Sequence, residues 1–476
     1  MPKVQSKTKV VATLGPATSS KEVLKDLIEA GVDVCRVNFS HGAYEDHGRI
    51  INYIREINHE NDYYTAILAD LQGPKLRIGE VENNGVDLKT GEKIKITTKK
   101  CIGTKEKVYI TYPQFPKDVQ AGETILIDDG KILLTVESTN REDEVVALIS
   151  HGGTLSSKKG VNLPNTKVSL PCLTEKDLQD LDFALENDIE WIGLSFVRKA
   201  SDILELKKII ADKGKSAKVV AKIEKPEAID EIDEIIANTD ALMVARGDLG
   251  VEIPMEKVPL TQKMLVKKCL EASIPIIIAT QMMESMITNF NPTRAEVNDV
   301  ANSVMDGADA VMLSGETSVG KFPVRVIQAV QKIISQVESF EGIYHKDHKP
   351  ISTKTRMITD LICFNAVKIA EHTNVAAIIA MTHSGYSAFK LSSYRPNCGI
   401  FIFTSNRSIL NTLSLVWGVK GLHYNKMVST DDTINDLQNI LKEKGYVKED
   451  DLVINMASIP MHEFGKSNML KLSFVY

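Results

Sequence analysis

The sequence predicts an α/β protein: a (β/α)8 TIM barrel with an inserted small β-barrel lid domain and a C-terminal α/β domain. Three observations support this prediction. Short β-branched and apolar runs alternate with helical patterns eight times before residue 340. The gap between the third and fourth runs contains hairpin-like strands and almost no helical signal. A polar stretch at 341–357 then separates the barrel from further strands and helices.

The eight predicted barrel strands are apolar on both faces, which is typical of parallel strands covered by helices. They span residues 8–14, 32–40, 64–70, 191–196, 218–224, 241–248, 274–280 and 309–316. If such strands close into a barrel, the active site lies at their carboxyl ends. An open doubly wound sheet is the alternative that this pattern leaves open.

The other two domains differ from the barrel in their patterns. The segments "GVDLKTGEKIKITT", "ETILIDDGKILLTVE" and "DEVVALIS" indicate short antiparallel strands, whereas "NVAAIIAMT", "GIFIFT" and "DLVINMA" alternate with helical segments near the carboxyl terminus. We therefore expect four segments. They are 1–75 and 171–340 for the two parts of the barrel, 76–170 for the inserted lid, and 341–476 for a C-terminal regulatory and oligomerisation domain.

The composition excludes several classes of protein. The 476 residues are 43% hydrophobic and 25% charged with a net charge of −6, so no nucleic-acid surface is indicated. No run approaches the roughly 20 apolar residues that cross a membrane, and the first apolar run is too short for a secretory signal. Six scattered cysteines without a CxxC pair fit a reducing compartment. We expect a cytoplasmic protein without nucleic-acid or membrane partners.

Polar side chains gather at the predicted carboxyl ends of the barrel strands. Residues two apart share one side of an extended strand, so each strand end presents its polar groups together. Gly247 would let the backbone approach a ligand closely, and a helix starting there would offer free N–H groups to an anion. The candidates are Arg36, Asn38, Ser40, Asp70, Lys222, Glu224, Gly247, Asp248, Thr280, Ser314 and Glu316.

The stretch "DLQGPKLRIG" adds Lys75 and Arg77 beyond the third strand. Two carboxylates, Glu224 and Asp248, without a histidine or cysteine ligand suit Mg²⁺ or Mn²⁺ better than zinc. Several cations beside such an ion suit a phosphorylated substrate. The sequence contains neither a GxxxxGK[ST] loop nor an HRD and DFG pair, so it predicts phosphoryl chemistry outside the common kinase classes.

At this point the motifs identify a family. The segments "KVVATLGPAT", "CRVNFSHG", "GPKLRIG", "KKGVNLP", "KIEKPE", "VARGDLGVEIP", "ATQMMESM", "PTRAE" and "DGADAVMLSGET" resemble pyruvate kinase, in order and over essentially the whole chain. The resemblance implies transfer of the phosphoryl group of phosphoenolpyruvate to ADP, which gives pyruvate and ATP in glycolysis. It also implies a homotetramer.

The resemblance assigns roles to individual residues. Glu224 and Asp248 would hold the divalent ion, and Lys222 would neutralise charge on the transferring phosphoryl group. Arg36 and Arg77 would clamp that group. The substrate would be bound by Gly247, Asp248 and Thr280, and Thr280 would lie at the carbon that is protonated. The residues near the nucleotide would be Arg36, Asn38, His41, Arg77 and Lys159. Asp129 of the lid would face the cleft.

The chain departs from many members of this family at the monovalent-cation site, which corresponds to Asn38, Ser40, Asp70 and the Leu71 carbonyl. Members that need K⁺ carry threonine at position 71, glutamate at 75 and threonine at 78. This chain has Leu71, Lys75 and Ile78, which is the pattern of members active without K⁺. Because the Lys75 ammonium can supply the charge that K⁺ would bring, we expect activity without K⁺. A solvated hinge lysine is the alternative.

In the C-terminal domain, "MTHSGYSA" resembles the loop that cradles an effector phosphate, with Thr382, Ser384 and Ser387 as candidates. The later loop lacks an arginine that helps to bind fructose 1,6-bisphosphate in some members and offers Lys466 in its place. A phosphorylated small-molecule effector and an inert structural turn both remain open.

The sequence also leaves two alternative functions to weigh. Another barrel enzyme of phosphoenolpyruvate or pyruvate, such as an aldolase, would not need the nucleotide-site cations Arg36, Arg77 and Lys159. A catalytically dead homologue should have lost one of Lys222, Glu224, Asp248 or Thr280, and all four are present.

Overall fold

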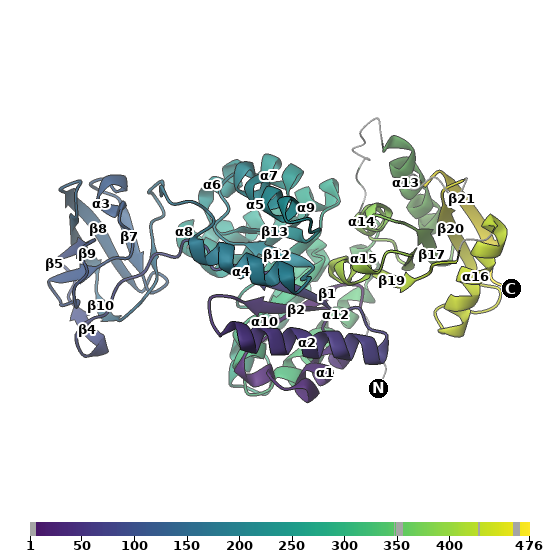
Figure 1. The fold of residues 1–476 in the computed structure, drawn as a ribbon, viewed down its shortest axis with the longest axis horizontal. Helices are drawn as coiled ribbons and strands as arrows, with labels where there is room; N and C mark the ends of the chain where they lie inside the picture. Colours follow the sequence, from purple (N-terminus) through teal and green to yellow (C-terminus); the bar gives the residue numbers. More distant parts are fainter. Residues whose placement is uncertain (1–5, 347, 349–355, 427–428, 460–466) are drawn as a thin grey trace.

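The computed structural model of the chain describes residues 6–346, 348, 356–426, 429–459 and 467–476. It consists of a central barrel with a β domain at one end and an α/β domain at the other (Figure 1). Within the described residues no helix combines the length and the apolar character that a membrane span requires.

Eight parallel strands close into a barrel, which confirms the predicted TIM-type fold and excludes an open doubly wound sheet. Around the barrel the order is β1-β16-β15-β14-β13-β12-β3-β2, so each strand lies beside its neighbour in the barrel's own sequence order. The strands are β1 (Lys9–Thr13), β2 (Val34–Asn38), β3 (Ala66–Asp70), β12 (Trp191–Leu194), β13 (Lys218–Ile223), β14 (Ala241–Ala245), β15 (Ile276–Ala279) and β16 (Ala310–Leu313).

Helices surround the barrel. Because the strands are apolar on both faces, the apolar sides of these helices are buried against the outer face of the strands. The main helices of this layer are α1 (Lys21–Ala30), α2 (Tyr44–Asn61), α4 (Glu175–Glu186), α5 (Ala200–Asp212), α7 (Ile232–Asn238), α9 (Val258–Ala272), α10 (Arg294–Asp306) and α12 (Pro323–Glu338). Local sequence sets their ends: Thr293 and Glu296 form a capping box at the start of α10, and Gly307 ends it at a φ of 104°.

Three short helices follow barrel strands directly, at their carboxyl ends. They are α6 (Pro226–Asp230) after β13, α8 (Arg246–Glu252) after β14 and α11 (Gly315–Ser318) after β16. Because α8 begins at the strand end, the amides of Gly247 and Asp248 lie in its first turn at the barrel mouth.

The inserted β domain is confirmed and takes the form of a curled six-stranded sheet beside a two-stranded ribbon. The sheet order is β11-β7-β8-β9-β5-β6, and the ribbon pairs β10 with β4. Its elements are β4 (Gly85–Leu88), β5 (Lys93–Thr97), β6 (Lys107–Tyr109), α3 (Phe115–Asp118), β7 (Thr124–Ile127), β8 (Ile132–Thr139), β9 (Glu144–His151), β10 (Gly153–Ser156) and β11 (Val161–Asn162). It has its own apolar core.

The C-terminal α/β domain is also confirmed. Its five-stranded sheet has the order β19-β18-β17-β20-β21, and β21 alone runs antiparallel to its neighbour. The elements are α13 (Met357–His372), β17 (Val375–Met381), α14 (Tyr386–Ser393), β18 (Gly399–Thr404), α15 (Arg407–Thr412), β19 (Val419–His423), α16 (Thr430–Glu443), β20 (Leu452–Ala457) and β21 (Met469–Phe474). The bounds of the four expected segments stay predictions.

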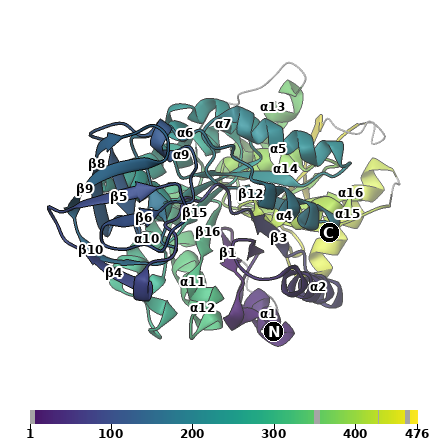
Figure 2. The same ribbon diagram turned by 60° about the vertical axis from the view of Figure 1, so that its left-hand side comes forward.

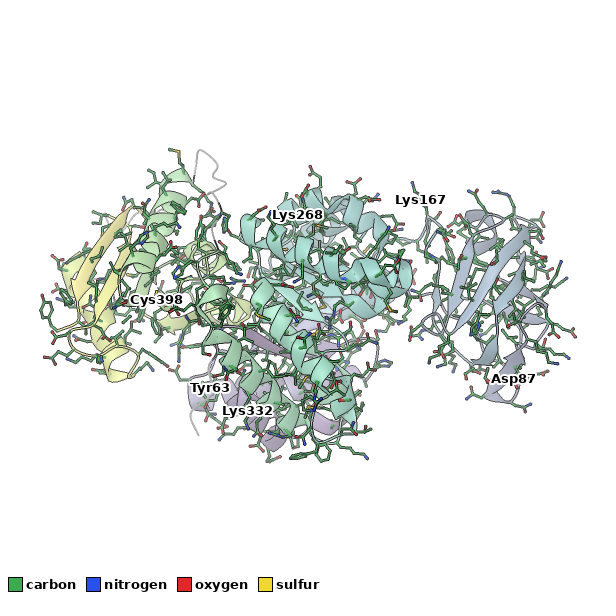
Figure 3. The ribbon with its side chains drawn as sticks, turned by 180° about the vertical axis from the view of Figure 1, so that it is seen from behind. Tyr63, Asp87, Lys167, Lys268, Lys332 and Cys398 are labelled. Carbon is green, nitrogen blue, oxygen red and sulfur yellow. The ribbon has the colours of Figure 1, made fainter. Side chains whose placement is uncertain are left out.

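The lid and the C-terminal domain lie at opposite ends of the barrel, as Figures 1 and 2 show from two directions. Figure 3 shows the same order from behind, with Asp87 in the lid and Cys398 in the C-terminal domain. Residues just before barrel strands contact the C-terminal domain, which therefore covers the amino ends of the barrel. These contacts join Tyr64 to Ser414, Glu190 to Asn411, and Asp309 to Arg395. The carboxyl ends are left to face the lid.

Candidate active site

Four charged side chains from neighbouring strand ends form one buried group, which we call the charge cluster: Arg36, Asp70, Lys222 and Glu224. The Arg36 guanidinium donates to the Asp70 carboxylate through Nε at 2.8 Å and also through Nη2. The Lys222 ammonium lies 3.0 Å from Asp70 Oδ1 and 3.0 Å from Glu224 Oε1. Side-chain exposure is 11% or less throughout. Each residue was a sequence candidate, and the barrel brings all four together.

The cluster stabilises the charged forms of two of its members. Burial favours a neutral Asp70, but the charges of Lys222 and Arg36 outweigh it and lower the pKa of that carboxyl. Burial would likewise lower the pKa of Lys222, but Asp70 and Glu224 overcome it and raise that pKa. Lys222 is therefore a fixed, buried cation.

Glu224 and Asp248 suit a divalent ion. Burial, followed by the negative charge of Asp248, raises the pKa of Glu224, so the two carboxylates repel each other through the site. A hard dication with oxygen ligands relieves that repulsion. Among the described residues no group of three or more histidine, cysteine, aspartate or glutamate side chains is placed to hold a metal. The oxygen donors of Glu224 and Asp248 fit a hard ion such as Mg²⁺ or Mn²⁺, which these two residues could hold.

Thr280 and Gly247 contact each other at the mouth. The Gly247 amide donates to Thr280 Oγ1 at 2.7 Å, and that hydroxyl donates to the Ala279 carbonyl at 2.6 Å. Thr280 and Gln281 have φ values of 70° and 55°, the left-handed region that a β-branched residue rarely occupies. The amide predicted to hold an anionic substrate group is thus beside the residue predicted to move a proton.

Arg246 holds this strained turn, and the sequence did not single it out as a candidate. Its Nη2 donates to the Thr280 carbonyl at 2.7 Å, and its Nε donates to the Ala279 carbonyl at 3.2 Å. Asp299 from α10 accepts two bonds of 2.7 Å from the same guanidinium. Arg246 directly precedes Gly247, and that adjacency was the one signal available in the sequence.

Ser195 and Phe196 are two further residues that the sequence did not flag. Glu224 Oε2 accepts the Phe196 amide at 2.8 Å, and Phe196 has a φ of 56°. The Ser195 hydroxyl accepts from Lys222 Nζ at 2.7 Å. Both residues follow β12 within the predicted strand 191–196, so their position at a strand end could have identified them.

The five predicted nucleotide residues, all of them described, do not form one contact network, and two of them contact lid residues. Arg77 Nη1 donates to the Lys158 carbonyl at 3.1 Å, and Lys159 pairs with Asp128 at 2.8 Å. Asp128, not its neighbour Asp129, makes this contact with Lys159, and Asp129 is exposed. His41 is exposed on the loop after β2.

The predicted monovalent-cation residues have mixed surroundings. Asn38 Oδ1 accepts the Ser40 amide at 3.1 Å, and the Leu71 carbonyl accepts the Ser195 hydroxyl at 2.7 Å. Lys75 is exposed, and a Cβ on Gly160 would lie 3.5 Å from its Cε. Within the described part of the chain Lys75 has no ion pair.

Ser314 and Glu316 have a structural role at the eighth strand end. The buried Glu316 carboxylate accepts the Ser314 amide at 2.7 Å and the Met283 amide at 3.0 Å. It therefore ties the loop after β16 to the loop after β15, with both oxygens engaged by backbone amides.

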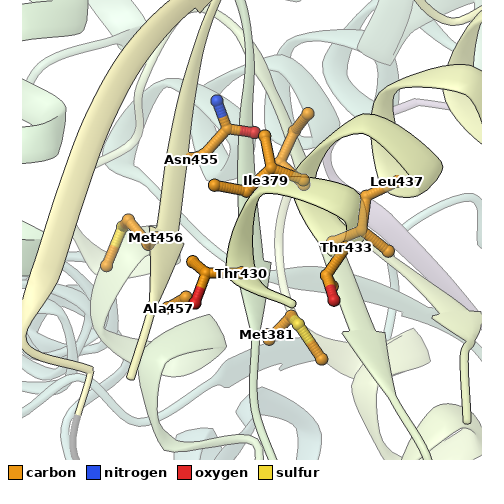
Figure 4. Close-up of a pocket in the computed structure, with 9 residues that line it drawn as sticks. Ile379, Met381, Thr430, Thr433, Leu437, Asn455, Met456 and Ala457 are labelled. Carbon is orange, nitrogen blue, oxygen red and sulfur yellow. The ribbon is translucent and has the colours of Figure 1, made fainter. Parts of the chain in front are cut away.

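The candidate effector loop forms the turn into α14. The Gly385 amide donates to Thr382 Oγ1 at 3.0 Å, and Gly385 has a φ of 80°. Ser384 is exposed and Ser387 is 2% exposed. A cavity of about 10 Å³ between β17, β20 and α16 lies nearby in the same domain, with Met381 at its edge (Figure 4). That volume suits one water at most. Lys466 lies outside the described residues.

The fold and this site together define a barrel phosphotransferase. Models of two families match the chain: "Pyruvate kinase, barrel domain" over residues 5–327 and "Pyruvate kinase, alpha/beta domain" over residues 360–473. The chain belongs to the pyruvate kinase family.

Similar proteins agree with this assignment. A pyruvate kinase of Geobacillus stearothermophilus is 43% identical over 99% of this chain and 81% of its own length. One from Corynebacterium efficiens is 40% identical over 98% of this chain and 97% of its own length. The crystal structure of a pyruvate kinase from Cryptosporidium parvum superposes with a TM-score of 0.92 at 35% identity, covering 99% of this chain and 96% of that chain.

Proposed function

We propose that this protein transfers the phosphoryl group of phosphoenolpyruvate to ADP, giving pyruvate and ATP, with Mg²⁺ or Mn²⁺ and without a K⁺ requirement. The observation that carries the proposal is the charge cluster at the barrel mouth, next to a carboxylate pair that suits a divalent ion. A transferring phosphoryl group needs alignment and charge neutralisation more than a covalent nucleophile.

The residues of this chain divide the task among them. Arg36 and Arg77 would align the phosphoryl group from the barrel and from the lid hinge. Lys222 would neutralise the negative charge that develops on the phosphoryl group and on the enolate oxygen. A bound divalent ion, held by Glu224 and Asp248, would supply Lewis-acid charge beside them.

Proton delivery follows from the contact between Gly247 and Thr280. A substrate carboxylate that accepts the Gly247 amide takes the place of Thr280 Oγ1, which holds that amide at 2.7 Å in the structure. The hydroxyl is then released to face the substrate carbon. Substrate binding would thereby prepare the proton donor, either directly or through a water molecule.

A coupled assay tests the main claim. Pyruvate formation is followed with lactate dehydrogenase and NADH, in the presence and absence of ADP and of Mg²⁺. We expect pyruvate formation only with both, and a loss of about 1,000-fold in kcat for Lys222→Met. An aldolase, which breaks a carbon–carbon bond and no phosphate ester, and a dead homologue would both form no pyruvate from phosphoenolpyruvate and ADP.

Independence from K⁺ rests on Lys75. Two unit charges 4 Å apart interact by about 4 kcal/mol at a surface-like dielectric, which is enough to matter for a transition state. We expect equal rates in K⁺ and in tetramethylammonium buffers for the wild type, and K⁺ activation of about 10-fold or more for Lys75→Glu. Lys89→Glu, the same change at an exposed lysine within the lid, is the matched control. Strict dependence of the wild type on K⁺ would refute the assignment.

We further propose a cytoplasmic homotetramer with a phosphorylated small-molecule effector at the loop of Thr382, Ser384 and Ser387. Exposed apolar side chains on α13 and β21, including Leu361 and Phe474, support association of copies. The test is light scattering for mass. Rate curves against phosphoenolpyruvate, with and without sugar phosphates and AMP, test regulation.

A further inference from the structure

The Lys222 ammonium has three N–H donors: it donates to Ser195 Oγ and, at 3.4 Å, to Asp70 Oδ2, and it forms an ion pair with Glu224. Asp70 and Glu224 each contact Nζ at 3.0 Å, and Ser195 Oγ accepts from it at 2.7 Å. The residue is 9% exposed, so an unmet donor would be costly in this place. Ser195 is the neutral member of the three.

The direction of the Ser195 proton follows from its second contact. The hydroxyl lies 2.7 Å from the Leu71 carbonyl oxygen, which can accept but not donate. The hydroxyl therefore donates to Leu71, and its lone pairs face the Lys222 ammonium. Such a chain of donors polarises along its length, which makes the hydroxyl a better acceptor for the ammonium.

Leu71 connects this chain of bonds to the lid. It is the first residue after β3, and the segment that follows leads into the inserted domain. Its amide donates to the Gly193 carbonyl at 3.0 Å, so β12 and the start of the hinge are bonded in both directions. Ser195 itself is 2% exposed and directly follows β12.

We propose that Ser195 is a positioning residue for Lys222: it receives one N–H of the ammonium and fixes its direction relative to the Leu71 carbonyl at the lid hinge. The inference rests on the proposed phosphoryl transfer. A third carboxylate in this place would add negative charge where an anionic phosphoryl group must approach, and an apolar residue would leave the ammonium free to tilt. A neutral hydroxyl avoids both.

Ser392 offers a matched control in the same chain. Its buried hydroxyl also accepts from a cation, Arg395 Nη1 at 3.1 Å, and donates to a backbone carbonyl, Trp417 at 2.7 Å. This second arrangement lies where the barrel meets the C-terminal domain, at the opposite end from the mouth. Alanine at either serine removes the same kinds of bond.

The experiment compares three variants with the wild type under saturating substrates and Mg²⁺. For Ser195→Ala we expect kcat to fall about 10- to 100-fold with KM for phosphoenolpyruvate within about threefold, because the lysine acts where charge develops. Ser195→Thr, which keeps the hydroxyl, should recover kcat to within about fivefold of wild type. Ser392→Ala should lower the melting temperature as much as Ser195→Ala does, with kcat within about twofold of wild type.

A double-mutant cycle shows whether Ser195 acts through Lys222. In a Lys222→Met background, replacing Ser195 by alanine should change kcat by less than about twofold. A further loss of 10-fold or more in that background would overturn the proposal, as would an unchanged kcat in Ser195→Ala or an equal loss in Ser392→Ala. A wild type that makes no pyruvate from phosphoenolpyruvate and ADP would reject the proposed function and this inference together.

Discussion

Neutralising Asp70 should destabilise the barrel far more than breaking an ion pair on its surface. Asp70→Asn keeps an oxygen for one hydrogen bond but removes the charge between Arg36 and Lys222, whose side chains are each 11% exposed. Arg36 would then lose its carboxylate partner, and Lys222 would keep only Glu224. Removing one partner of a buried ion pair costs about 3–5 kcal/mol. For a unit of barrel size, 1 kcal/mol corresponds to about 2–4 °C, so we expect the melting temperature to fall by about 6–20 °C.

The assay is thermal unfolding followed by circular dichroism, with Asp46→Asn as the control. Asp46 pairs with Arg49 at 2.7 Å, but these side chains are 53% and 51% exposed, so the loss should stay below about 1 kcal/mol. Equal, small shifts in the two variants would refute the view that burial sets the strength of the charge cluster.

The same substitution should change the acid limb of stability. The folded-state pKa of Asp70 lies below its ordinary value of 3.8, so its contribution is present above that pH and lost as pH falls through the folded value. Asp70→Asn should therefore flatten the decline of the wild type's unfolding free energy on acidification. Urea titrations at a series of acidic pH values measure that slope.

Three further substitutions have distinct readouts. Arg246→Lys cannot hold both the Thr280 carbonyl and a carboxylate in one fork, so kcat should fall about 10-fold with unchanged circular dichroism. Asn162→Ala removes the 2.8 Å hydrogen bond from β11 to Glu252 of α8. Hydrogen exchange of the backbone amides where the lid joins the barrel should then accelerate about 10-fold, while exchange in the lid core stays unchanged. Burial lowers the pKa of Lys7 from 10.5 to about 8, so unfolding free energy should rise with pH between these values, and Lys7→Met should abolish that rise.

The sequence predicted the barrel and its charged mouth because both depend on local patterns. Apolar runs of strand length mark the strands, and parallel closure places every strand end at one face. Arg36, Lys222 and Glu224 could therefore be assigned to one site before any contact was known. Their partners could not be assigned in the same way, because the bond from Ser195 to Leu71 depends on the pairing of β12 with β3, which are far apart in sequence.

The lid shows a second limit of predicting contacts from the sequence. Asp128 and Asp129 are adjacent, and both have a φ of 55° in the turn after β7. Of the two carboxylates Asp128 pairs with Lys159, and adjacency in the sequence could not decide between them. The expectation that Asp129 faces the cleft stays a prediction.

The charge balance of the site distinguishes cations that pair with a carboxylate from cations that do not. The charge cluster contains two cations and two carboxylates, so it neutralises itself and holds its members in place. Lys159 is likewise paired with a lid carboxylate. Among the described residues Arg77 and Lys75 pair with no carboxylate, and both lie on the hinge that carries the lid. In the proposed function a phosphorylated substrate brings negative charge beyond what the self-neutral cluster offsets, so these two hinge cations would add to Arg36, Lys222 and the divalent ion in balancing it. Lys75→Glu would replace one of these two cations with an anion. An added monovalent cation would supply positive charge again, which is why we expect K⁺ to activate this variant.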